Sequence, residues 1–166
     1  MTLSSSTKPL SVLPLEPSDR GWRDSLLAER WGESLVVSRG TLHDASRLPG
    51  FKAVIEGRPA GHLTFRFEGD ACEIVTLDSI EECRGVGTAL MEAVRREAGE
   101  QGCRRIWLIT TNDNLHAIGF YQRRGYRLCA LHAGALETSR RLKPSIPLIG
   151  MNGIPLRDEL EFELLL

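Results

Sequence analysis

Apolar and polar residues alternate between residues 51 and 78, and this alternation predicts three consecutive antiparallel strands. We place them at residues 51–56, 60–67 and 71–78. In the middle strand one face would be apolar and the other polar, the apolar set being Leu63, Phe65 and Phe67 and the polar set His62, Thr64 and Arg66. The short stretches "EGRP" and "EGD" between the strands are suited to tight turns.

A helical spacing of apolar residues follows these strands. It predicts a helix over residues 86–98, with its apolar face at Val86, Leu90, Ala93, Val94 and Ala98. The almost continuous apolar run "RIWLIT", residues 105–110, is typical of a strand covered on both faces. The strand at 71–78, this helix and the strand at 105–110 therefore form a βαβ unit, whose two strands are parallel.

The N-terminal part is less regular. Residues 11–15 suit a short first strand, and Ser18 and Asp19 are cap residues for a helix running to about Arg30. Residues 32–50 indicate a short strand and then a loop. The Ser/Thr-rich residues 1–10 are expected to form a flexible tail.

The C-terminal part predicts one more helix and two more strands. "TNDN", residues 111–114, supplies cap residues for a helix that ends at Gly125. Strands follow at residues 126–131 and 159–166. Residues 133–158 form a long insertion between them, with too many apolar residues for a free linker, and we expect it to pack over a site or against a partner chain, which leaves a homodimer open.

These elements predict one domain over residues 1–166 with an α+β (mixed α/β) fold. Its central sheet would be mixed but mostly antiparallel, of about six or seven strands, with helices on both faces. A length of 166 residues is enough for one domain with a real core and too short for two ordinary ones.

Composition and charge exclude several classes of function. The chain is 42% apolar and 26% charged, with a net charge of −1 and a pI of about 6.4, so neither a general nucleic-acid binder nor a basic membrane-surface protein is indicated. We find neither a secretory h-region nor an apolar run of membrane-spanning length, which favours a cytoplasmic protein. The scattered cysteines lack metal-ligand spacing and indicate free thiols and no metal site, the four being Cys72, Cys83, Cys103 and Cys129.

A Gly-rich turn, Arg84-Gly85-Val86-Gly87-Thr88, opens the predicted helix at 86–98. The first N–H groups of a helix have no internal partners and carry the positive end of its dipole, so they bind anions. Glycines let a phosphate approach the backbone closely. The turn is not a P-loop, because Gly-Lys-Ser/Thr does not follow, and Leu90 replaces the third glycine of a Rossmann turn.

A different phosphate turn fits better. Arg84-Gly85-Val86-Gly87 resembles the Gln/Arg-x-x-Gly-x-Gly/Ala acyl-CoA loop of the GNAT superfamily of N-acyltransferases. "NLHAIGFYQRRGY", residues 114–126, is similar to the second signature of that superfamily, at Asn114, Ala117, Tyr121, Gly125 and Tyr126. The resemblance covers residues 71–128, and the two motifs stand about thirty residues apart in the expected elements.

The resemblance implies an acetyl-CoA-dependent N-acetyltransferase in which a primary amine attacks the thioester directly. It also implies a GNAT-like sheet whose two parallel strands splay apart, so that residues 77–80 can pair with the pantetheine arm. The cofactor-binding residues that it implies are Leu77, Asp78, Ile80, Arg84, Gly85, Val86, Gly87, Thr88, Asn114, Ala117 and Tyr121.

One position departs from the motif. Glu82 stands where the superfamily usually has Gln or Arg, and a carboxylate beside a pyrophosphate is unfavourable if both point the same way. Arg84 would help to balance this charge. Arg123 and Arg124 are candidates either for contact with the cofactor phosphates or for interaction with the end of their own helix.

The reaction needs a base for the amine and a proton donor for the leaving thiolate. Tyr121 stands where the superfamily has a tyrosine that faces the thiolate, and it is the candidate acid. "EIVTLDSI", residues 73–80, resembles the strand of some histone acetyltransferases whose first Glu is the base, which makes Glu73 the candidate base. Asp78, expected on the other face of the same strand, is a rival, as is a water chain; His62 and His43 are weaker rivals.

The acceptor stays open between a small molecule and a protein amine. Its pocket would be built from the first helix and loop, at Trp22, Trp31 and His43, and from the insertion at 133–158. Two other functions compete with catalysis. The chain could be a non-catalytic acyl-CoA-binding or sensor protein, which Glu82 would favour, or a binder of another nucleotide.

Overall fold

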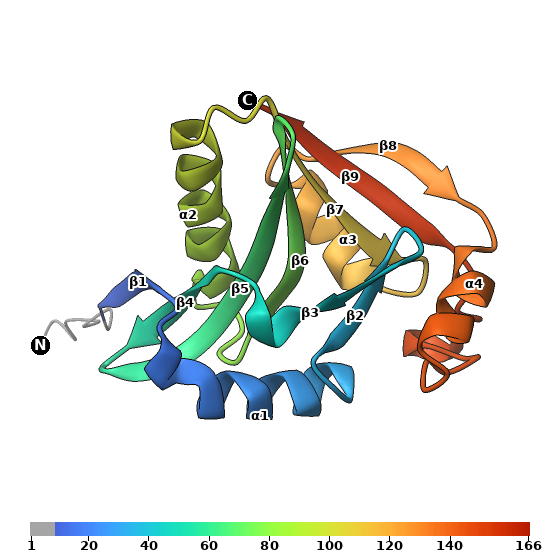
Figure 1. Cartoon of the computed structure of the whole chain (residues 1–166), viewed down its shortest axis with the longest axis horizontal. Helices are drawn as coiled ribbons and strands as arrows, with labels where there is room; N and C mark the ends of the chain where they lie inside the picture. The colour runs from blue at the N-terminus through green and yellow to red at the C-terminus, as the bar shows by residue number, and fades with distance from the viewer. Residues whose placement is uncertain (1–8) are drawn as a thin grey trace, which may run out of the picture.

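A computed structural model of the chain describes residues 9–166 and has the α+β fold expected (Figure 1). Its main sheet has seven strands in the order β1-β4-β5-β6-β7-β9-β8, and β2 and β3 form a separate two-stranded sheet. The strands are β1 Leu10–Pro14, β2 Leu35–Ser38, β3 Thr41–Asp44, β4 Gly50–Ile55, β5 Arg58–Glu68, β6 Ala71–Ser79, β7 Arg105–Thr111, β8 Arg127–His132 and β9 Glu159–Leu165. Most of the expected N-terminal tail lies outside the described residues, and Leu10 belongs to β1.

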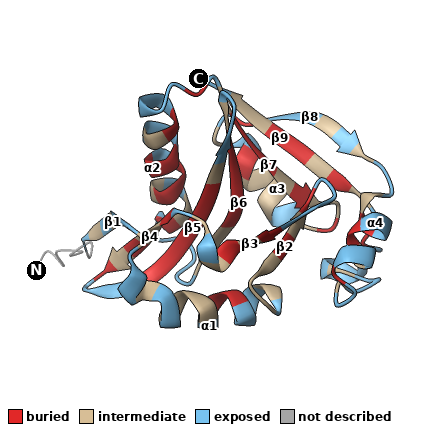
Figure 2. Cartoon of the chain, viewed as in Figure 1, coloured by how far each residue is buried: buried red, intermediate tan, exposed pale blue. Residues whose placement is uncertain are grey.

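Helices cover both faces of the main sheet. They are α1 Arg20–Trp31, α2 Val86–Glu100, α3 Leu115–Gln122 and α4 Ala135–Leu142. On one face α2 and α3 pack in the larger hydrophobic cluster, and Figure 2 shows the buried side of α2 turned towards the sheet. On the other face α1 and β2 pack in a second cluster around Leu27, Val36 and Val75. None of the helices described is long and apolar enough to cross a membrane.

Two details of the N-terminal part differ from the prediction. The side chain of Asp19 does not cap α1; it accepts a hydrogen bond from the N–H of Glu16 at 2.8 Å and pairs with Lys52 at 2.7 Å. The segment at 32–50 is a hairpin rather than a strand and a loop, because Arg39 and Gly40 both take positive φ and turn β2 directly into β3. This hairpin and α1 together cover the polar face of β5, so that His62 and Thr64 are buried.

A β-bulge in β6 changes which side chains share a face. Thr64 pairs with Thr76 and Phe65 with Ile74, so Val75 is left without a partner on β5. The extra residue shifts the alternation, and Asp78 lies on the same face as Glu73, where Trp31 and Ser38 contact them. The prediction that these two carboxylates lie on opposite faces was therefore wrong.

The parallel pair β6–β7 is paired over only part of its length. Residues 71–74 of β6 pair with residues 105–108 of β7. Both strands continue beyond this point, β6 to Ser79 and β7 to Thr111, without further pairing to one another. The splay expected from the resemblance is thus present, and it leaves a gap in the sheet at the carboxyl ends of both strands.

Gly61 allows a test of how closely β5, β6 and α2 pack beside this gap. A Cβ atom at Gly61 would lie 2.5 Å from the carbonyl oxygen of Asp78 and 2.6 Å from Val86 Cγ1. We therefore expect Gly61→Ala to lower the free energy of unfolding by about 2 kcal/mol, measured by urea denaturation. The matched control is Gly99→Ala, in α2 with open space around it, which should raise that free energy by about 0.5 kcal/mol. Equal effects of the two substitutions would contradict the close packing.

Candidate functional site

A cavity of about 710 Å³ occupies the gap between the splayed strands. Its wall is formed by the second half of β6, the turn before α2, the end of β7, α3, and the insertion that contains α4. Nine of the residues predicted to hold a cofactor line it together, namely Leu77, Asp78, Gly85, Val86, Gly87, Thr88, Asn114, Ala117 and Tyr121.

Other residues named from the sequence lie outside the cavity wall. Ile80 donates its N–H to the carbonyl oxygen of Ala60 at 2.8 Å, and Arg84 pairs with Glu81 at 3.6 Å. Trp22 and His43 do not line the cavity, whereas Trp31 does.

The turn before α2 has the geometry of an anion site. Gly85 is the N-cap with φ of 76°, and no side chain caps the N–H groups of the first helical turn. Gly87 also has a packing role, which the sequence did not indicate. A Cβ at Gly87 would lie 2.8 Å from Phe120 Cζ, so the glycine lets α3 pack against the start of α2.

Arg124 connects the end of α3 to this turn. Its guanidinium donates to the carbonyl oxygen of Phe120 at 3.0 Å and to the hydroxyl of Thr88 at 2.6 Å, and lies 3.4 Å over the Phe120 ring. Arg124 therefore both satisfies a carbonyl near the C-terminus of its own helix and holds positive charge beside the turn. Arg123 also lines the cavity, as do Glu81 and Glu82.

Tyr121 lies deep in the cavity wall. Its ring contacts the rings of Phe120, Tyr126 and Phe162. Burial, with a smaller effect from the charge of Asp78, raises the pKa of Tyr121 above its ordinary value, so the phenol is protonated at neutral pH. Within the described part of the chain its hydroxyl makes no hydrogen bond, which leaves it available to a ligand.

Asp78 is a carboxylate of the cavity wall, and its side chain is 10% exposed. Burial raises the pKa of Asp78 to about 6, against the opposing effects of a 2.9 Å hydrogen bond from Trp31 Nε1 and of the Arg30 charge. His62 Nδ1 lies 3.8 Å away, but burial lowers the pKa of His62 to about 4, so this imidazole is neutral at neutral pH and does not form an ion pair. Asp78 is therefore mostly ionised at pH 7 and yet close to its titration range.

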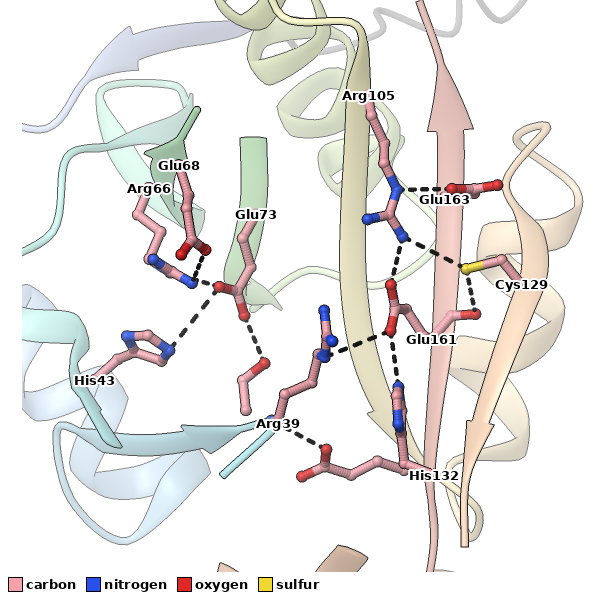
Figure 3. A network of polar contacts seen from close by, with 12 residues as sticks. Arg39, His43, Arg66, Glu68, Glu73, Arg105, Cys129, His132, Glu161 and Glu163 are labelled. Atoms are coloured by element: carbon pink, nitrogen blue, oxygen red, sulfur yellow. Dashed lines mark hydrogen bonds and ion pairs between the residues drawn. The ribbon is translucent and has the colours of Figure 1, made fainter. Parts of the chain in front are cut away.

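Glu73 lies outside the cavity wall, and its carboxylate is occupied by protein groups (Figure 3). It accepts a hydrogen bond from Ser38 Oγ at 2.5 Å and pairs with Arg66 Nε at 2.5 Å, and His43 Nε2 lies 3.9 Å away. Burial lowers the pKa of His43. Ser38 and His43 belong to the hairpin, so these contacts hold the β2–β3 hairpin on β6.

Several residues of the cavity were not identified from the sequence. Glu159 begins β9 and is buried in the wall, and the insertion contributes Leu136, Ser139, Lys143, Ile146, Met151 and Leu156. The only signal for Glu159 was the repeat of glutamates at every second position of "ELEFELLL", which puts Glu159, Glu161 and Glu163 on one face of a strand. Nothing in the sequence indicated that the first two of them are buried.

Residues 13–126 match the model of the acetyltransferase (GNAT) family. A Bacillus subtilis (strain 168) relative, the uncharacterized protein YdhI, is 44% identical over 152 residues, which is 91% of this chain and 95% of the relative.

Solved structures have the same fold. A Bacillus subtilis acetyltransferase in complex with CoA superimposes with a TM-score of 0.70 at 20% identity, covering 95% of this chain and 99% of the other. A GNAT family acetyltransferase from Elizabethkingia anophelis with acetyl-CoA bound gives a TM-score of 0.67 at 16% identity, covering 95% and 98%. With a family match over more than half its length, this chain belongs to the acetyltransferase (GNAT) family.

Proposed function

We propose that the protein is an N-acetyltransferase that moves an acetyl group from acetyl-CoA to a primary amine by direct attack. The observation that carries this proposal is one continuous cavity, which joins the uncapped turn at the start of α2 to Tyr121 and Asp78 through the splayed strands. Family membership and structural neighbours with bound CoA and acetyl-CoA support it.

The cavity fits acetyl-CoA at both ends. The N–H groups of residues 86–88 and the guanidinium of Arg124 would hold the pyrophosphate, since they supply donors and positive charge at one place. Asn114 uses its Oδ1 to accept the N–H of Ala117 at 3.1 Å, so its amide donors are left for the pantetheine arm. The unpaired edge of β6 at residues 77–79 offers backbone groups to that arm.

Asp78 is the base in this proposal. A base works best when its pKa lies near the working pH, and Asp78 meets this condition in the cavity wall. Its hydrogen bond from Trp31 fixes one carboxylate oxygen and leaves the other for the proton of the attacking amine. Glu73 would serve instead to position the hairpin, because Ser38 and Arg66 occupy its oxygens.

Tyr121 is the acid. It is protonated at neutral pH and lines the cavity near the charge of Asp78. The departing CoA thiolate belongs to a thiol with a pKa of about 8.5, and a phenol beside it can supply the proton as the carbon–sulfur bond breaks.

Cofactor binding is tested first by thermal unfolding with millimolar CoA, acetyl-CoA or ATP. We expect both CoA compounds to raise the Tm and ATP to leave it nearly unchanged.

Thr88→Glu should abolish this rise in Tm, because it puts a carboxylate at the turn that would hold the pyrophosphate. An acidic residue in the first turn of a helix does not destabilise it, so α2 should stay folded in this variant. Glu82→Gln should tighten CoA binding about threefold, because it removes a negative charge from the cavity wall. A wild-type protein that is not stabilised by CoA would refute the cofactor assignment.

The role of Tyr121 is tested by steady-state kinetics with thiol release as the signal and a panel of amines. Tyr121→Phe keeps the buried ring contacts and removes only the hydroxyl. We expect kcat to fall about 100-fold while the KM for acetyl-CoA changes less than about threefold. A loss confined to the KM for acetyl-CoA would show that the hydroxyl binds cofactor and does not transfer a proton.

The two carboxylates are distinguished by their pH profiles. Asp78 must be deprotonated to act as a base, so kcat/KM for the wild type should rise with pH through about 6 and then level off with respect to this group. Asp78→Asn should lower kcat/KM about 100-fold or more and remove this step. Glu73→Gln should keep the step and lower the Tm, because it breaks the Arg66 pair that holds the hairpin. The opposite pattern would return the base role to Glu73.

A further inference from the structure

Glu159 is a buried carboxylate in the cavity wall, and its charge is not balanced by an ion pair within the described residues. The residue is 2% exposed and lines the end of the cavity formed by β2, α4 and β9. Its Oε2 accepts the N–H of Arg39 at 3.1 Å. The guanidinium of Arg39 is turned to Glu161, at 3.7 Å, and Glu159 makes no ion pair with any residue in the described part of the chain.

The other oxygen of Glu159 has only a shared donor. Ser139 Oγ lies 3.3 Å from Oε1, but the same hydroxyl lies 3.1 Å from the carbonyl oxygen of Ala135. A hydroxyl has one proton to donate, so it cannot satisfy both acceptors. Burial of this under-partnered group raises the pKa of Glu159. Such a group is expensive to keep in a fold unless a ligand completes it.

The one lysine of the cavity wall does not complete it. Lys143 donates its ammonium to the carbonyl oxygens of Trp31 at 2.9 Å and Leu35 at 2.7 Å, and Glu33 lies 3.9 Å away. Lys143 thereby ties the end of α4 to the last residue of α1 and the first residue of β2. Lys143 and Trp31 both line the cavity, so this tie is part of its wall.

Apolar side chains from α1, β2 and the insertion line the same cavity as Asp78 and Glu159, namely Trp31, Val36, Val37, Leu136, Ile146 and Leu156. The cavity of about 710 Å³ must also take the acetyl end of the cofactor, so the remaining space suits a short acceptor. An acceptor that fits has an amine near Asp78, a short apolar body, and a second positive charge at Glu159.

We propose that the acceptor is a small diamine, with one amine acetylated beside Asp78 and Tyr121 and the other held as an ammonium by Glu159. This inference rests on the proposed acetyltransferase function. The reacting nitrogen forms a bond to the acetyl carbon and loses a proton to Asp78. The carbon–sulfur bond breaks, and the sulfur takes a proton from Tyr121 to leave as CoA thiol. The second amine keeps its protons throughout.

The test compares α,ω-diamines from 1,3-diaminopropane to 1,8-diaminooctane with n-alkylamines of equal length. For the wild type we expect kcat/KM to be about 30-fold higher for the best diamine than for its matched monoamine. Glu159→Gln should lower the diamine value to that of the matched monoamine, so that the preference for diamines is lost.

Glu161→Gln is the matched control. Glu161 lies two residues further along β9 and is also buried, but it does not line the cavity, and it is paired with Arg105, Arg39 and His132 (Figure 3). This substitution should lower the Tm and keep the preference for diamines. The inference is overturned if monoamines and diamines react equally well, if both glutamine variants lose the preference alike, or if a peptide with a free N-terminus is preferred.

Calorimetric titration of diamines into the protein–CoA complex separates this inference from the proposed function. If no amine is acetylated, the catalytic proposal fails. Diamine binding that is lost in Glu159→Gln and kept in Glu161→Gln would then still support the site. Absence of diamine binding to the wild-type complex would overturn the inference even if other amines are acetylated.

Discussion

The structure of the site depends on the point where the parallel strands stop pairing. β6 and β7 exchange hydrogen bonds only as far as Ile74 and Leu108 and then diverge. A continuous sheet would bury the second half of β6 between two neighbouring strands and leave no room for a ligand. Because the strands splay, the edge of β6 beyond Ile74 is free on its β7 side, and the turn before α2, α3 and the insertion all meet at the resulting gap.

The bulge at Val75 puts two carboxylates of one strand, Glu73 and Asp78, on the same face of the sheet but among different partners. Without it, the regular alternation would put Glu73 and Asp78 on opposite faces of the sheet. With it, both face the side covered by α1 and the hairpin, where Ser38 and Arg66 bind Glu73 and Trp31 binds Asp78. Glu73 is paired with Arg66 and holds the hairpin on β6, whereas Asp78 has no charged cation beside it within the described residues. The two carboxylates thus differ in their partners, and Glu73 is also the more deeply buried of the two.

The local elements could be predicted from the sequence because each one had a signal of its own. The strands at 51–78 showed a period of two, the helix after Gly85 showed helical spacing, and Asn114 capped α3 as expected. What could not be predicted depends on contacts between distant segments. A bulge shifts the alternation without leaving a mark in composition, and the polar face of β5 is buried only because α1 and the hairpin fold over it. The sequence alone gives Glu159 the pattern of an ordinary strand residue. Its burial depends on distant segments, such as α4 of the insertion, where Ser139 contacts it.

Asp78 and Glu159 also show that the site is not optimised for stability. Glu159 is buried and the Asp78 side chain is 10% exposed. Desolvation raises the pKa of both carboxyl groups, and neither has a charged cation at ion-pair distance within the described residues, since His62 is neutral. Each therefore destabilises the folded state at neutral pH relative to its neutral isostere, by an amount that the rest of the core must offset. By contrast, Glu73 and Glu161 are buried and paired with arginines. The fold therefore leaves unpaired the two carboxylates that line the cavity, and so keeps negative charge where a cationic amine would bind and react.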